Sequence, residues 1–257
     1  MLDKTIKEIH LVDNTNSDLF KIMNRQLMNI LKDIDLFKKY LDIQSIFEKY
    51  SVGNVLLILS QAPNTKQLNR NKQSLKDIEV NLIQPKKNHK KDFNNYKLYS
   101  SERSSKLNNY YNDNKLLLKG FLNMSPVDIK VIDELNDKCV FWDKNMNLLY
   151  IKRGSEYKDL FYGIAKELTK EELGSDETEL LKFKINCISY MILKKYNIDT
   201  SIIKINEIPK DFIKNNPKEI REELNELKDG LMIFTNRVNS FFNELYKNNS
   251  KDNFKGR

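Results

Sequence analysis

The chain has 257 residues, of which 40% are hydrophobic and 31% charged. Its hydrophobic fraction is well above that of disordered proteins. Its seven glycines, five prolines and two cysteines exclude collagenous, Gly-rich phosphate-binding and disulfide-scaffold proteins. No apolar run approaches the roughly 18 to 20 residues of a membrane helix, and the first residues lack a signal-peptide core. We therefore expect a cytoplasmic protein with no membrane partner.

The formal net charge of +8 lies entirely in the middle of the chain. Residues 61–119 contain thirteen Lys or Arg residues against five acidic residues, whereas residues 1–60 and 120–257 each balance to zero. A positive excess confined to one stretch predicts a surface that contacts a polyanion.

Hydrophobic periodicity predicts helices in the N-terminal part. Apolar residues at helical spacing predict one helix over 18–42 and a second from about 44 to 59, which ends before Pro63. The basic, turn-rich region that follows holds three short strand candidates, at 78–83, 96–99 and 116–118.

The pattern changes from residue 125 onward. Ser125 as N-cap and Pro126 at the first helical position predict a helix that ends near Leu135. Two strands follow around a turn at 143–145, and then three helices; the strands are expected at 140–142 and 148–152, and the helices at 157–173, 176–196 and 218–246.

These elements predict an α+β fold with two domains. Residues 1–124 form a helical N-terminal region on a small sheet, and residues 125–257 form a mainly helical domain with a short sheet. The boundary is placed near residue 124.

The sequence offers little catalytic chemistry. Its two histidines, His10 and His89, lie far apart, and Cys139 and Cys187 each precede an apolar residue, which favours small buried side chains. No nucleophile-elbow pattern or Gly-rich phosphate loop is present. We therefore predict no catalytic residue, no metal and no cofactor, although carboxylates are too abundant for their spacing to single out an acid–base pair.

One helical segment has the spacing of a metalloprotease motif. Lys166, Glu167 and Lys170 occupy the positions of H-E-x-x-H, with lysine at both histidine positions. In that motif the two imidazoles bind the metal and the glutamate activates its water, whereas two ammonium groups would repel a dication. Alone, K-E-x-x-K is also an ordinary salt-bridged helix face.

Residues 50–63 resemble the signature Y-S-x-x-N-x-L-L-I-x-x-Q-x-P of the ArdC-like antirestriction proteins and the related LtrC-like proteins of mobile elements. The matching residues are Tyr50, Ser51, Asn54, Leu56, Leu57, Ile58, Gln61 and Pro63. Outside this segment the resemblance extends weakly over nearly the whole chain, and the family's tryptophan and glycine-rich stretch are missing around 68–77.

The resemblance implies an N-terminal single-stranded-DNA-binding domain followed by a degenerate zincin-like domain, a pseudo-metalloprotease. It also implies a mobile genetic element such as a plasmid, a role in antirestriction or conjugation, and restriction or conjugation proteins as further partners. The alternative is a pseudo-metalloprotease that acts as a protein-interaction or regulatory module, in which the basic stretch serves only solubility.

Single-strand binders combine basic groups that follow the phosphates with aromatic rings on which bases stack. The candidate DNA-binding residues are Tyr50, Ser51, Asn54, Gln61, Lys66, Arg70, Lys72, Lys86, Lys87, Lys90, Lys91, Tyr96, Lys97, Tyr99, Arg103 and Lys106. Two alternatives remain open: the aromatic residues could face a core, and Asn54 and Gln61 could instead bond backbone groups.

Overall fold

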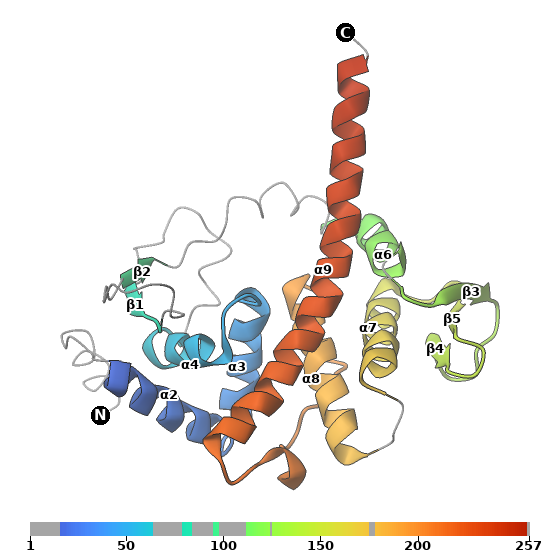
Figure 1. Ribbon diagram of the computed structural model, residues 1–257. Coiled ribbons are helices and arrows are strands. Elements are labelled where there is room, and N and C mark those ends of the chain that lie inside the picture. The colour runs from blue at the N-terminus through green and yellow to red at the C-terminus, as the bar shows by residue number, and fades with distance from the viewer. Residues whose placement is uncertain are drawn as a thin grey trace. The chain divides into compact units, whose positions relative to one another are not determined.

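The structure is a computed structural model that describes residues 16–63, 79–83, 95–97, 112–123, 125–174 and 178–255. The described part has the predicted α+β class, with helices that dominate two small sheets (Figure 1). Contacts divide the chain into unit 1, residues 1–100 and 206–225, and unit 2, residues 101–205 and 226–257. Within the described ranges, no helix is both long and apolar enough to span a membrane.

The described part of unit 1 begins with the helices α2 (Asn16–Ile30), α3 (Ile34–Ile46) and α4 (Val52–Gln61). The prediction of one helix over 18–42 was wrong, because Asp33 caps a new helix at that point. Its Oδ1 accepts hydrogen bonds from the backbone N–H groups of Asp35 at 2.9 Å and Leu36 at 3.0 Å. An N-cap carboxylate satisfies donors at a helix start, so the apolar periodicity continues across two helices.

A short hairpin accompanies these helices. Strands β1 (Glu79–Asn81) and β2 (Asn95–Lys97) pair antiparallel, with Val80 opposite Tyr96. Both lie at predicted strand candidates, and β1 contacts α4.

A late segment of the chain completes unit 1. It contains the 3-10 turn η3 (Lys210–Phe212) and the start of α9 (Pro217–Lys255). The fully buried ring of Phe212 packs edge-on against Phe37, with centroids 6.0 Å apart. The contact units therefore differ from the predicted boundary near 124, because residues 206–225 pack with the N-terminal helices and α6 belongs to unit 2.

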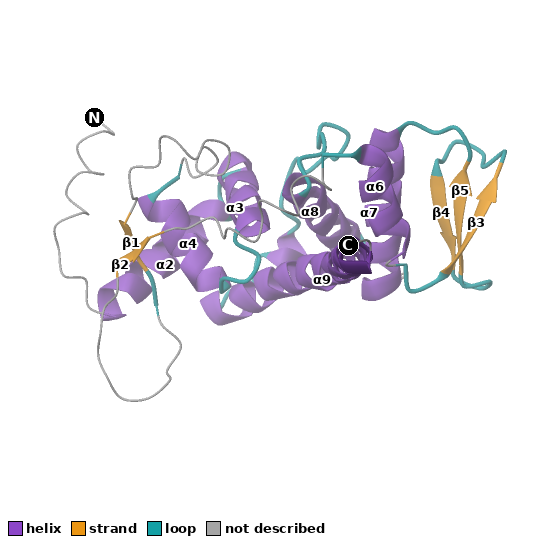
Figure 2. Cartoon of the chain, turned by 90° about the horizontal axis from the view of Figure 1, so that it is seen from above, coloured by secondary structure: helices purple, strands orange, loops and turns teal. Residues whose placement is uncertain are grey.

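Unit 2 contains a three-stranded sheet beside helices (Figure 2). Its strand order is β3-β5-β4, in which β3 pairs parallel and β4 antiparallel with the central strand. Its described elements are α6 (Asn114–Asn123), β3 (Asp128–Ile132), β4 (Val140–Asp143), β5 (Leu148–Lys152), α7 (Tyr157–Leu173), α8 (Glu179–Lys195) and the part of α9 from residue 226 onward.

Two predictions in this unit were wrong. Residues 125–135 contain strand β3, since the Ser125 hydroxyl forms a turn with Val127, accepting from its N–H and donating to its C=O, and caps no helix. Residues 116–118 lie in helix α6, whose start is capped by Asp113 Oδ1. A three-residue apolar run fits a strand or a helix, and this cap decides between them.

Candidate functional site

The signature segment forms helix α4 and the turn that precedes it. The Ser51 hydroxyl accepts a hydrogen bond from the Asn54 N–H at 3.2 Å and caps the helix. The Tyr50 ring lies edge-on to Phe47, with centroids 5.3 Å apart, and is half-buried. Both residues thus help to define the start of α4.

Asn54 holds the hairpin onto α4. Its Nδ2 donates to the Ile83 carbonyl at 3.1 Å, and its Oδ1 accepts from the Ile83 N–H at 2.9 Å. The side-chain amide therefore pairs with one residue in the same way as a neighbouring strand would. The sequence left open whether Asn54 binds DNA or bonds backbone groups, and in the structure its side chain bonds backbone groups.

Gln61 also bonds backbone, since its Nε2 donates to the Leu57 carbonyl at 3.1 Å within α4. Tyr96 and Lys97 lie on β2, opposite Val80 and Glu79. The other candidate DNA-binding residues lie outside the described residues: Lys66, Arg70, Lys72, Lys86, Lys87, Lys90, Lys91, Tyr99, Arg103 and Lys106. Four of these lysines lie in the connection between β1 and β2.

In unit 2, Glu167 faces strand β4. It is 6% exposed, and its Oε2 accepts a hydrogen bond from the Trp142 N–H at 3.2 Å. One turn earlier on α7, a Cβ on Gly163 would lie 2.7 Å from Val140 Cγ2. The absence of a side chain at Gly163 therefore allows α7 to approach β4, and the carboxylate binds a backbone N–H of that strand.

The two lysines beside Glu167 are half-buried. Lys166 Nζ lies 5.7 Å from the ring centroid of Tyr162, within the range of a cation–π interaction. Burial raises the pKa of the Tyr162 hydroxyl, and the nearby Glu167 carboxylate raises it further.

A zinc ion does not fit these residues. Lysine binds a metal only when deprotonated, and the ordinary pKa of lysine is about 10.4. The carboxylate between the two lysines already accepts the Trp142 N–H. In the part of the chain that the structure describes, no group of three His, Cys, Asp or Glu side chains could hold a metal; His10 and His89 lie outside that part.

The cysteines differ in their surroundings. Cys187 is fully buried, and burial raises the pKa of its thiol, as expected for a small core residue. Cys139 is half-buried, so the expectation of a buried side chain holds only in part for it.

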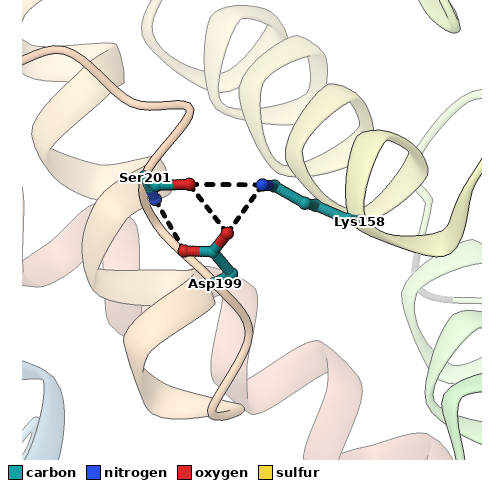
Figure 3. Close-up of polar contacts among 3 residues, drawn as sticks. All are labelled: Lys158, Asp199 and Ser201. Atoms are coloured by element: carbon teal, nitrogen blue, oxygen red, sulfur yellow. Dashed lines mark hydrogen bonds and ion pairs between the residues drawn. The ribbon is translucent and has the colours of Figure 1, made fainter.

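A polar cluster ties the start of α7 to the chain after α8 (Figure 3). Lys158 Nζ lies 2.6 Å from Asp199 Oδ2 and 3.2 Å from Ser201 Oγ, while the Ser201 hydroxyl donates to Asp199 Oδ2 at 2.7 Å. The hydrogen bonds from Lys158 and Ser201 hold the pKa of the Asp199 carboxyl well below its usual range.

This cluster is not a Ser–Lys nucleophile pair. A lysine that activates a serine is usually desolvated, whereas the Lys158 side chain is 45% exposed and paired with a carboxylate. The cluster was not predicted, because 43 residues separate Lys158 from Ser201 and no periodicity links them.

Comparisons with protein-family models, with curated proteins and with solved structures found no match. The functional proposal therefore rests on this chain's own residues and on the resemblance of residues 50–63.

Proposed function

We propose that this chain binds single-stranded DNA with little sequence preference, as a protein of a mobile genetic element, and performs no bond chemistry. The observation that carries the proposal is the charge distribution, with the entire excess of eight positive charges in residues 61–119. Phosphates dominate nucleic-acid affinity, and a cluster of Lys and Arg is the electrostatic feature that they require.

The geometry of unit 1 supports this proposal. The β1–β2 hairpin holds both ends of the connection that contains Lys86, Lys87, Lys90 and Lys91. Asn54 fixes Ile83, which precedes this lysine group closely in the chain. A binding segment with anchored ends loses less conformational entropy when it binds than a free tail does.

The resemblance of residues 50–63 extends the proposal to antirestriction or conjugation, with the restriction or conjugation proteins as further partners. We also infer that unit 2 hydrolyses no peptide. Lysine at both histidine positions supports this inference, as does the hydrogen bond between Glu167 and the Trp142 N–H.

The test is a fluorescence titration of the full chain with labelled single- and double-stranded oligonucleotides at several salt concentrations. We expect tighter binding to the single strand and a slope of log K against log salt of about −0.7 per phosphate neutralised. Replacement of Lys86, Lys87, Lys90 and Lys91 by glutamine should reduce the slope by about 2.8 if each lysine contacts one phosphate. All base sequences should weaken equally, because phosphate contacts carry no base information.

The matched control replaces four exposed lysines outside the basic stretch by glutamine, namely Lys144, Lys204, Lys210 and Lys218. This variant loses the same charge and should retain the original slope within about one unit. Undetectable binding at low salt, or an equal loss in both variants, would exclude the proposed site.

A further inference from the structure

Strand β3 leaves one edge of the unit 2 sheet open. The opposite edge, β4, contacts α7, whereas β3 is the outermost strand, and no described element of unit 2 lies beyond it in Figure 2. Two of its apolar side chains are exposed, Ile129 at 36% and Val131 at 51%. Their register partners on β5, Leu149 and Ile151, are buried on the same face of the sheet.

The backbone of these two residues points outward. The Arg153 N–H donates to the Ile132 carbonyl at 2.8 Å, so the polar groups of Ile132 face β5. Successive residues of a strand direct their N–H and C=O groups to opposite sides. Ile129 and Val131 therefore present their hydrogen-bonding groups at the open edge, together with exposed apolar side chains. Such an edge is a template for another strand.

We propose that β3 pairs with β3 of a second copy of this chain, antiparallel about a two-fold axis at Ile129, to form a continuous six-stranded sheet. A two-fold axis makes each contact occur twice and requires a strand that is complementary to itself. The sequence of β3 meets this requirement in the register centred on Ile129.

The charges select this register. It places Asp128 opposite Lys130 of the second copy on one face of the sheet, and Lys130 opposite Asp128, so two opposite-charge pairs form. On the other face, Ile129 meets Ile129, and Val131 meets Val127. Centring on Lys130 would instead place two lysines opposite each other.

A register centred on Val131 is also unfavourable. Centring on Val131 places Asp128 opposite Glu134 and Ile129 opposite Asp133. Like charges directly opposite each other destabilise an antiparallel pair. The contact is short, so the dimer is expected to be weak, as interfaces below about 1,000 Å² are.

The first experiment is sedimentation of the full chain from about 10 to 500 µM, the range in which a small interface would associate. We expect a monomer–dimer equilibrium. Asp128→Lys and Lys130→Asp should each raise the dissociation constant about tenfold, because each creates like-charge pairs on both sides of the axis. The double variant D128K/K130D restores opposite charges and should return the dissociation constant to near its original value.

Rescue by the double variant distinguishes the proposed register from a general charge effect. As controls, Asp211→Lys and Lys210→Asp make the same charge changes at exposed positions on η3 and should leave the equilibrium unchanged. A chain that stays monomeric throughout, or a double variant no better than the single variants, would overturn the proposal. Thermal unfolding of each variant shows that it is folded.

A second experiment tests the register by cross-linking in the Cys139→Ser background. In the proposed pair the two Ile129 Cα atoms would lie about 5.5 Å apart, within the range that a disulfide spans. Ile129→Cys should therefore yield a covalent dimer on mild oxidation, whereas Val131→Cys, which faces Val127, should yield several-fold less. Equal or absent cross-linking by the two variants would refute the register.

Discussion

Replacement of Asn54 by alanine should loosen the attachment of the hairpin to unit 1. The substitution removes two hydrogen bonds, from Nδ2 to the Ile83 carbonyl and from the Ile83 N–H to Oδ1, at 3.1 Å and 2.9 Å. A hydrogen bond contributes about 1 kcal/mol net to stability, so the pair contributes about 2 kcal/mol. Because both bonds are partly buried, water can reach the Ile83 backbone in the variant, and we expect no larger loss.

Two measurements report the loss of these hydrogen bonds. The free energy of urea unfolding, monitored by far-UV circular dichroism, should fall by about 2 kcal/mol, and the population of opened molecules should rise about 30-fold. Hydrogen exchange of residues 79–83 should accelerate, because the Ile83 N–H loses its acceptor. Asn54→Asp retains an acceptor for that N–H but removes the donor, so its free energy of unfolding should lie between those of the wild type and Asn54→Ala.

Asn123 supplies the matched control. Its Nδ2 also donates to a backbone carbonyl, that of Lys119 at 2.9 Å, but the residue is exposed and the bond stays within α6. Asn123→Ala should therefore change stability by less than about 0.5 kcal/mol. If Asn54→Ala costs no more than this control, the Asn54 contact does not hold the hairpin.

Three further predictions concern unit 2. Glu167→Ala should lower the free energy of urea unfolding, measured by Trp142 fluorescence, by about 1–3 kcal/mol, because the buried backbone N–H of Trp142 loses its acceptor. Glu167→Gln retains an acceptor oxygen and should lower it less, so equal losses would contradict this prediction. The pKa of the Asp199 carboxyl is lowered in the folded protein, so its ionised form stabilises the fold above the unfolded pKa of about 3.9, and this stabilisation is lost as the pH falls. Asp199→Asn should therefore make the fall of Tm between about pH 4 and 2 less steep, and an unchanged profile would contradict this prediction. Elemental analysis of the purified protein should find no stoichiometric zinc, and Lys166→His with Lys170→His should increase zinc affinity; tightly held zinc in the unmodified chain would contradict the inference on unit 2.

The sequence predicted the strongly periodic parts of the fold best. Helix α7 has the predicted bounds, and α8, α9, β4 and β5 lie at their predicted places. Long amphipathic stretches and apolar–polar alternation give clear patterns. The errors arose where one side chain decides a boundary: Asp33 interrupts the first helix, Asp113 starts α6, and Ser125 turns the chain into β3.

The site was less predictable because its contacts join distant residues. The sequence singled out Asn54 and Glu167, but their partners Ile83 and Trp142 lie 29 and 25 residues away. A single sequence contains no pattern for such pairs, since neither helical nor strand periodicity relates the two partners. The open edge at β3 was missed for a different reason: the Ser125–Pro126 pair suggested a helix and obscured the alternation in the residues that follow.

The divided course of unit 1 affects how the chain folds during synthesis. Phe212 and the rest of residues 206–225 are translated only after residues 101–205 of unit 2. At a translation rate of about 5–20 residues per second, the ring of Phe212 is synthesised several seconds or more after Phe37, against which it packs. During this time the apolar side chains of α2 and α3 lack part of their cover and are available to chaperones. Unit 2 is also incomplete at that point, because its residues 226–257 are translated last, so both units are expected to reach their final packing only near the end of synthesis.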